Sequence, residues 1–183
     1  MIGIAVFFLG TLAILRLSWR SLHSLKAHGF YRFFAFELLA GLIAVNLPIW
    51  FQDPWCARQI ASYVFGAISI SLAAEGFRLL IKIGKPSADT TQNTNLAFEN
   101  TTRLVTAGAY RFIRHPLYAS LLALLICAWL KAPLSAVNIA LAFAAAGLLL
   151  ATALAEEKEN LARFGAEYAE YMKRTRRFVP FLF

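Results

Sequence analysis

The fold is decided by residues 108–157, which read GAYRFIRHPLYASLLALLICAWLKAPLSAVNIALAFAAAGLLLATALAEE. This stretch contains two long runs without a charged residue, 115–130 and 132–155, with a single lysine between them. So short a connection between two apolar helices leaves room only for a tight turn, which predicts an antiparallel helical hairpin. The polar motif before the first run and the two glutamates after the second would then lie at the same end of the hairpin.

The composition indicates a membrane protein. Hydrophobic residues make up 60% of the 183 residues and the mean hydropathy is +0.61, which is too apolar for an ordinary soluble domain. Three further charge-free runs cover residues 1–15, 38–51 and 60–74. A helix needs about 20 residues to cross a hydrocarbon core, so the shorter runs must extend into their flanks. We predict an all-α, polytopic membrane protein with about five transmembrane helices in one domain, residues 1–183.

The chain divides into two halves around the polar segment 84–95, which is rich in turn-forming residues. Residues 1–83 hold three predicted helices, and residues 84–183 hold the hairpin and a polar tail. An apolar stripe at helical spacing predicts that the tail forms an interfacial helix. The stripe consists of Leu161, Phe164, Tyr168 and Tyr171.

The distribution of basic residues predicts the orientation. The flanks at 16–32, 75–115 and 156–183 hold four, six and six Lys or Arg, whereas the loops at 51–59 and 131–132 hold one each. This bias puts the N-terminus outside and the C-terminus in the cytoplasm. Because the basic residues flank spans and form no separate module, the net charge of +8 favours contact with membrane lipids over nucleic acid.

No metal site is predicted. Cys56 and Cys127 form no CxxC pattern. Cys56 is predicted in an external loop and Cys127 inside a span, so no disulfide between them is predicted. The three histidines, His23, His28 and His115, are too dispersed in the predicted topology to share an ion.

Two glutamates fall inside or near predicted spans, where an unpaired charge is costly. For Glu37 and Glu75 the preferred interpretation is a buried network with Arg32 or Arg78. A role in substrate access is the alternative.

Counting along the hairpin predicts a polar pocket. With Ala132 as the apex, His115 lies 17 residues before it and Glu156 lies 24 after it. The two acids would overhang His115 by about seven residues, or about 10 Å at 1.5 Å per residue. Glu156 and Glu157 should therefore face Gly108–Tyr110 as much as His115. The pocket would lie between the linker, the open end of the hairpin and the tail.

These motifs, taken in order, resemble the isoprenylcysteine carboxyl methyltransferase family and, more loosely, the phospholipid N-methyltransferases. The resemblance covers roughly residues 84–183 and implies that this part of the chain is the cofactor-binding half. It rests on GAYRFIRHPLY at 108–118, the pair Glu156-Glu157, Phe164-Gly165-x-x-Tyr168-x-x-Tyr171, and Arg177-Phe178-Val179-Pro180.

The resemblance implies a methyltransferase that uses S-adenosylmethionine, releases S-adenosylhomocysteine, and acts at the cytoplasmic membrane face on a lipid-like or prenylated acceptor. Arg114 and Arg174 would hold the acceptor, expected to be a carboxylate, which a guanidinium can grip with two hydrogen bonds. Carboxylates suit the hydroxyls or ammonium of the cofactor, and tyrosines suit its adenine. The residues expected to bind the cofactor are Gly108, Tyr110, His115, Pro116, Tyr118, Glu156 and Glu157.

Several alternatives remain open at this point. An amine acceptor would need proton removal, for which Glu157 is the candidate. A membrane reductase using NADPH would have a similar helical architecture but would need more basic groups for a pyrophosphate. A scaffold protein would leave the pairing of motif and acids unexplained. The chain also has Ser120 where the family usually has glycine, two residues after the motif tyrosine, and this side chain would leave a cofactor less room to approach that helix face.

Overall fold

The computed structural model describes residues 2–25, 27–87 and 96–182, and this part of the chain is helical with no strand. The prediction of an all-α protein is therefore confirmed. Three short 3₁₀ or π turns matter for the site: Leu80–Gly84, Ala97–Glu99 and Gly108–Arg111. The α-helices are α1 Ile2–Ser18, α2 His28–Asn46, α3 Ala57–Leu79, α4 Pro116–Trp129, α5 Ala136–Phe164 and α6 Ala166–Arg174.

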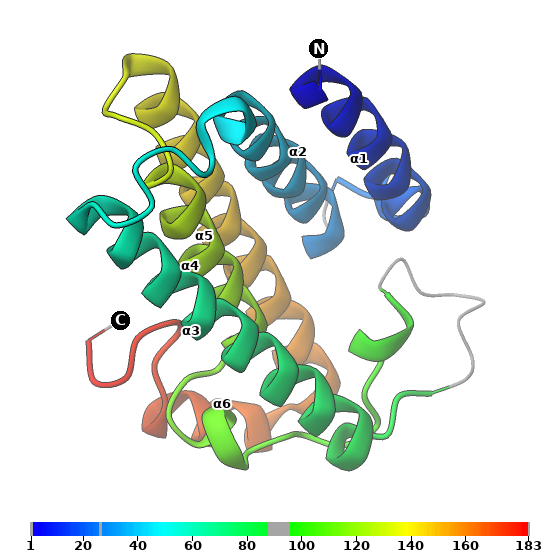
Figure 1. Ribbon diagram of the computed structural model, residues 1–183. Helices are drawn as coiled ribbons and strands as arrows, with labels where there is room; N and C mark the ends of the chain where they lie inside the picture. Colours follow the sequence, from blue (N-terminus) through cyan, green and yellow to red (C-terminus); the bar gives the residue numbers. More distant parts are fainter. Residues whose placement is uncertain (1, 26, 88–95, 183) are drawn as a thin grey trace.

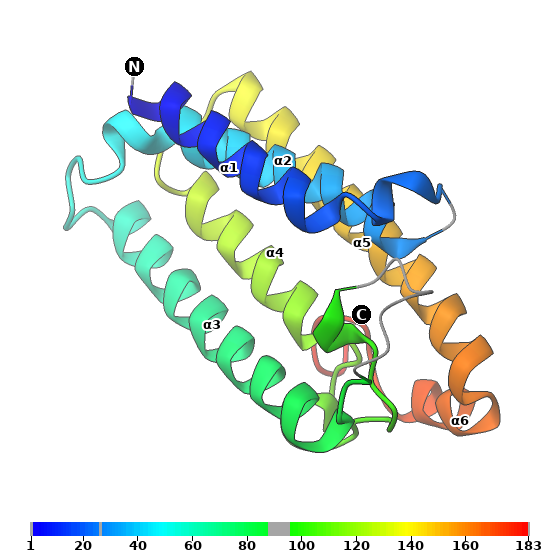
Figure 2. The same ribbon diagram turned by 90° about the vertical axis from the view of Figure 1, so that its right-hand side faces the viewer.

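The five long helices pack side by side around a core built from α2, α4 and α5 (Figures 1 and 2). The helix α1 lies along the outer side of α2, and α3 lies along α4. Leu42, Ala128 and Ala145 meet at the centre and are fully buried. The short helix α6 lies across one end of the bundle, beside the turns that precede α4 (Figure 2).

Three helices are long and apolar enough to cross a membrane: His28–Ile49, Ala57–Gly84 and Ala136–Phe164. The helices α1 and α4 are also apolar but have 17 and 14 residues. At 1.5 Å per residue α4 is about 21 Å long, less than the roughly 30 Å of a hydrocarbon core. These helices and the many large apolar side chains on their outer faces agree with an integral membrane protein.

Two helices extend beyond the charge-free runs that predicted them. The helix α2 begins at His28, because Arg32 is paired with Glu99 and can be buried inside the bundle. The helix α5 continues through the two glutamates to Phe164 and ends where Gly165 adopts a φ of +55°. Most side chains avoid this left-handed backbone, so glycine separates α5 from α6.

Buried polar side chains join the helices. Asn46 Nδ2 donates to the Ala128 carbonyl at 2.9 Å, and Ser62 Oγ donates to the Cys127 carbonyl at 2.9 Å. At the end of the bundle away from α6, Lys131 Nζ donates to a glutamine at 2.9 Å, which satisfies a buried charge between helices. These bonds fix α4 against α2 and α3.

The network expected for the intramembrane glutamates is not formed. Arg32 pairs with Glu99 instead of Glu37, and within the described residues neither Glu37 nor Glu75 lies in an ion pair. Glu37 Oε2 accepts a hydrogen bond from a threonine of α1 at 2.7 Å, and Glu75 Oε1 accepts one from the Ala109 backbone at 3.1 Å. Single hydrogen bonds from neighbouring elements thus take the place of the predicted salt bridges.

Candidate functional site

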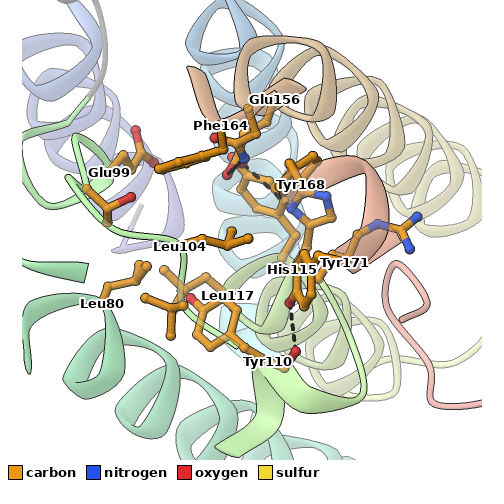
Figure 3. Close-up of a pocket in the computed structure, with 15 residues that line it drawn as sticks. Leu80, Glu99, Leu104, Tyr110, His115, Leu117, Glu156, Phe164, Tyr168 and Tyr171 are labelled. Carbon is orange, nitrogen blue, oxygen red and sulfur yellow. Dashed lines mark hydrogen bonds and ion pairs between the residues drawn. The ribbon is translucent and has the colours of Figure 1, made fainter. Parts of the chain in front are cut away.

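A cavity lies between the turns that precede α4, the last turns of α5, and α6. It encloses about 620 Å³ of free space, including the part open to solvent. Figure 3 shows acidic, aromatic and aliphatic side chains converging on it from these elements. The cavity is lined by Leu80, Glu99, Thr101, Leu104, Val105, Tyr110, Arg114, His115, Leu117, Tyr118, Glu156, Asn160, Phe164, Tyr168 and Tyr171.

The two glutamates of α5 meet His115. Glu156 Oε2 lies 3.7 Å from His115 Nδ1, and Glu157 Oε1 lies 3.5 Å from His115 Nε2. They are closer to the histidine than hairpin counting indicated. Glu156 lines the cavity, whereas Glu157 is buried behind it.

Glu157 is the hub of a buried ion-pair cluster. Arg114 donates to Glu157 Oε1 through Nε at 2.9 Å and lies 2.8 Å from it through Nη2. The third guanidinium nitrogen of Arg114 donates to the carbonyls of Met172 and Thr175 at the end of α6. Arg177 donates to both oxygens of Glu157 at 3.2 to 3.3 Å. The cluster ties the segment before α4, the end of α5 and the tail into one unit.

Backbone hydrogen bonds reinforce this join. Arg114 N donates to the Arg176 carbonyl at 2.7 Å, and Arg176 N donates to the Phe112 carbonyl at 3.0 Å. His115 N donates to the Arg177 carbonyl at 3.1 Å. The tail therefore pairs with the Arg-His motif as a short strand would, and it holds the histidine at the entrance of α4.

The aromatic side of the cavity is rigid and stays uncharged. Tyr171 Oη donates to the Tyr110 carbonyl at 2.7 Å, and the rings of Tyr168 and Tyr171 pack at 5.8 Å between centroids. Burial raises the pKa of Tyr110, Tyr168 and Tyr171 above that of a free phenol. These side chains can stack on a ligand or hydrogen-bond to it, but they do not ionise near neutral pH.

Two buried polar atoms at the cavity wall lack a hydrogen-bond partner among the described residues. They are the hydroxyl of Tyr118 and Nε2 of His115, which faces Glu157 at 3.5 Å without the geometry of a hydrogen bond. The two rings stack with centroids 5.5 Å apart, so neither group is free to turn away. Buried polar groups are almost always hydrogen-bonded, which makes the Tyr118 hydroxyl, in the cavity wall, a candidate for contact with a ligand.

The opposite wall carries Glu99, which reasoning from the sequence missed. Its carboxylate pairs with Arg32 and lies 3.3 Å from His28 Nε2. His28 Nδ1 in turn lies 2.8 Å from Glu159 Oε2. The only sequence signal for this network is a buried arginine in an apolar helix, which requires an acid somewhere else in the chain.

The remaining predicted residues lie around the cavity and not in its wall. Gly108 has a φ of +58°, and a Cβ there would lie 2.3 Å from Glu75 Oε1, so it shapes the turn. Pro116 is buried at the start of α4. Arg174 is exposed, in a separate depression lined by Phe112, Lys173, Arg176 and Phe181. Ser120 Oγ donates to a carbonyl of its own helix at 2.7 Å and does not line the cavity.

An apolar groove runs along the outer side of α3 and α4, behind the Arg-His motif. It encloses about 1,400 Å³, including open space, and Glu75 and Arg111 are its charged lining residues. Phe178, which contacts the His115 ring at 6.2 Å between centroids, also lines the groove. The groove is formed by Phe65, Ile68, Leu72, Glu75, Gly108, Ala109, Arg111, Phe112, Ile113, Ala119, Leu122, Ala123, Ile126, Phe178, Val179 and Pro180.

A family model described as the isoprenylcysteine carboxyl methyltransferase (ICMT) family matches residues 67–163. The chain belongs to this family. No curated protein and no solved structure matches it. Family membership confirms the resemblance predicted from the motifs, and it makes the chain an integral membrane methyltransferase.

The matched segment of this ICMT-family chain contains most of the cavity wall, from Leu80 to Asn160. It holds the Arg-His motif, Glu99 and both glutamates of α5. The α2 residues that hold Glu99, and the α6 tyrosines that close the aromatic side, lie outside it. The cavity therefore joins a family segment to parts of the chain on either side.

Stability should depend on the ionisation of Glu99. Burial raises its pKa, but the hydrogen bond from His28 and the charge of Arg32 outweigh burial and lower the pKa from 4.5 to about 2. A carboxyl whose pKa is lower in the folded state stabilises the fold above its unfolded pKa, and that stabilisation is lost as the pH falls toward the folded value. In mild detergent, the melting-temperature gap between the parent protein and Glu99→Gln should be full above about pH 5 and shrink as the pH falls toward 2.

The exposed Glu167 provides the matched control. Glu167→Gln should leave the melting temperature unchanged at each pH. A gap for Glu99→Gln that stays constant from pH 7 to pH 3 would contradict the ionised, paired state of Glu99.

Proposed function

We propose that this protein is an S-adenosylmethionine-dependent methyltransferase that binds its cofactor in the cavity at His115 and methylates a lipid-like carboxylate at the cytoplasmic membrane face. The carrying observation is the buried Tyr118 hydroxyl, which has no hydrogen-bond partner among the described residues and lines the cavity with His115 and the Glu156 carboxylate. Family membership supports the reaction class.

The cavity lining fits such a cofactor. When bound, S-adenosylmethionine supplies a methyl group on a positively charged sulfur. Glu156 presents a carboxylate with a quarter of its side chain exposed, which can accept from an ammonium or a hydroxyl. Phe164 and Tyr168 offer ring faces to the adenine, while the Tyr118 hydroxyl offers a hydrogen bond and the His115 ring lines the cavity beside it.

Other predicted cofactor residues are proposed to act on the shape of the cavity. Tyr110 forms part of its wall and receives the Tyr171 hydrogen bond on its carbonyl. Gly108 permits the preceding turn, and Pro116 starts α4 at a position that needs no backbone donor. Glu157 acts through Arg114, by fixing the motif segment against α5.

The acceptor is proposed to lie with its hydrocarbon chain in the apolar groove. Phe112 lines both the groove and the basic depression that contains Arg174, so an acidic head group at the end of the groove would meet that arginine. The donors of Arg114 are already bound to Glu157 and to two carbonyls. We therefore assign acceptor contact to Arg174 and a positioning role to Arg114.

A carboxylate acceptor needs little chemical activation. It is already ionised and nucleophilic at neutral pH, so the enzyme has to align it with the methyl donor and exclude water. The Arg114 cluster holds the motif in place, and Phe178 packs on the His115 ring. An amine acceptor, the alternative for this family pattern, would require a base. Glu157 is paired with two arginines, so the cavity-lining Glu156 is better placed for that task.

The cavity disfavours the reductase alternative. A nicotinamide dinucleotide carries a pyrophosphate that requires several basic groups or a glycine-rich helix start. Among the described lining residues, Arg114 and His115 alone can carry positive charge, and both face glutamates.

The proposal includes the topology. All five helices α1 to α5 would span the membrane, with α4 and α5 as an antiparallel hairpin, the N-terminus outside and the C-terminus in the cytoplasm. The distribution of basic residues supports this orientation: the segments at the cavity end hold sixteen Lys or Arg, and the loops at the opposite end hold two.

Binding of cofactor product tests the proposal. Calorimetry in mild detergent should give saturable, one-to-one binding of S-adenosylhomocysteine and none of NADPH. Glu156→Ala should weaken the binding of S-adenosylhomocysteine about tenfold, the value of one charge-assisted hydrogen bond. Glu170 is exposed, so Glu170→Ala should leave this affinity unchanged. Binding of NADPH but not S-adenosylhomocysteine would overturn the proposal.

Transfer of labelled methyl tests the acceptor. Incubation with labelled S-adenosylmethionine and a membrane lipid extract should give a product whose label is released by mild base, as a methyl ester requires. Arg174→Ala should lower the turnover without changing the affinity for S-adenosylhomocysteine, because it contacts the acceptor alone. A base-stable label would assign N- or S-methylation and remove the carboxylate from the proposal.

A further inference from the structure

Glu99 is a largely buried acid in the cavity wall. It belongs neither to the Arg-His motif nor to the glutamate pair of α5. Its side chain is 11% exposed, and Figure 3 shows it on the side of the cavity away from His115 and Tyr171. It stands at the end of the turn Ala97–Glu99, and its carboxylate accepts from the Leu96 backbone at 3.0 Å. The proposed function leaves this acid without a task.

The hydrogen bonds of Glu99 leave one acceptor position open. A carboxylate has about four lone-pair positions, two on each oxygen. Oε2 faces two donors, Leu96 N and His28 Nε2, whereas Oε1 receives Arg32 Nη1. The remaining position belongs to Oε1, on a side chain that lines the cavity.

The charge around that position selects the ligand group. Arg32 is 1% exposed and bonds to the same oxygen, so its positive charge would repel a second cation there. A neutral hydroxyl meets no such repulsion and gains a bond to a charged acceptor. Glu156 has no Lys or Arg partner within the described residues, and its neighbours are His115 and Asn160. The ammonium therefore suits Glu156, and a hydroxyl suits Glu99.

We propose that Glu99 binds a ribose hydroxyl of the cofactor, and that Arg32 and His28 are positioning residues that hold its carboxylate in the cavity wall. This inference rests on the proposed function, because it assumes that the cavity takes a nucleoside cofactor. The Tyr118 hydroxyl across the cavity, which is buried without a hydrogen-bond partner among the described residues, points independently to a polar ligand between these walls.

The positioning residues bring α2 into the site. His28 and Arg32 lie one helical turn apart in α2, before the segment that matches the family. His28 is also fixed by Glu159 of α5, through Nδ1 at 2.8 Å and its backbone nitrogen at 2.8 Å. The N-terminal half of the chain thus determines where one cavity acid stands.

A cycle of protein and ligand changes tests the assignment. Affinities of the parent protein and Glu99→Ala are measured for S-adenosylhomocysteine and for its 2′-deoxy and 3′-deoxy analogues. The parent should bind the analogue that lacks the bonded hydroxyl about tenfold or more weakly than it binds S-adenosylhomocysteine. In Glu99→Ala, S-adenosylhomocysteine itself should bind about tenfold more weakly, and the same analogue should bind no worse than it.

Matched variants separate a ligand contact from a structural effect. Glu159→Gln disturbs the same histidine from outside the cavity, so it should lower the melting temperature and preserve the parent's tenfold preference for the hydroxyl. If Glu99→Ala does not purify as folded protein, Glu99→Gln replaces it and should reduce that preference. The assignment would be overturned if each analogue lost as much affinity in the Glu99 variants as in the parent. It would also be overturned if Glu159→Gln lost the preference for the hydroxyl. If the parent fails to bind S-adenosylhomocysteine at all, the proposed function itself fails.

Discussion

The ion pair between Arg114 and Glu157 is the interaction on which the cavity depends. It joins three segments that are separate in the sequence: the Arg-His motif, the end of α5 and the tail at the end of α6. In a site with little water, a charge without a partner costs several kcal/mol, and removal of Glu157 would leave the Arg114 guanidinium without an anionic partner. Arg177, on the same carboxylate, adds a second bond between the tail and α5. The tail is therefore held as a wall of the cavity.

The same constraint explains the second cluster. Arg32 lies in an apolar helix and is tolerated because Glu99 reaches it from a turn 67 residues later. Each cluster uses an arginine to fix an acid, but with opposite results. Glu157 is turned away from the cavity, whereas Glu99 lines it. The cavity thus presents two carboxylates, Glu99 and Glu156, of which one is compensated by arginine and one is not. In the proposed site, this difference would allow the two acids to bind different groups of one ligand.

Much of this architecture can be predicted from the sequence, and the exceptions have physical causes. Charge-free runs located the apolar helices because burial in lipid excludes unpaired charge. They misplaced the start of α2, where the pairing of Arg32 allows a charge inside the bundle. The number of helices that cross the membrane stays a prediction, since α1 and α4 are short.

The cavity lining was predictable where a single motif, or the geometry of the hairpin, brings its residues together. The motif from Arg114 to Tyr118 and the acid Glu156 were found, and they line one cavity. The network of His28, Glu99 and Glu159 could not be found this way, because its bonds join residues 71 and 131 positions apart. Arg174 was grouped with Arg114 by charge and motif alone. The structure puts its side chain in another depression, because Arg114 already occupies the join between α5 and the tail.

The most direct measurement is an experimental structure of the protein with S-adenosylhomocysteine bound. The account predicts ligand density in the cavity between Glu99, Glu156 and His115, with Glu157 still bound to Arg114. Ligand density in another part of the molecule, or a ligand that displaces Glu157 from Arg114, would contradict it.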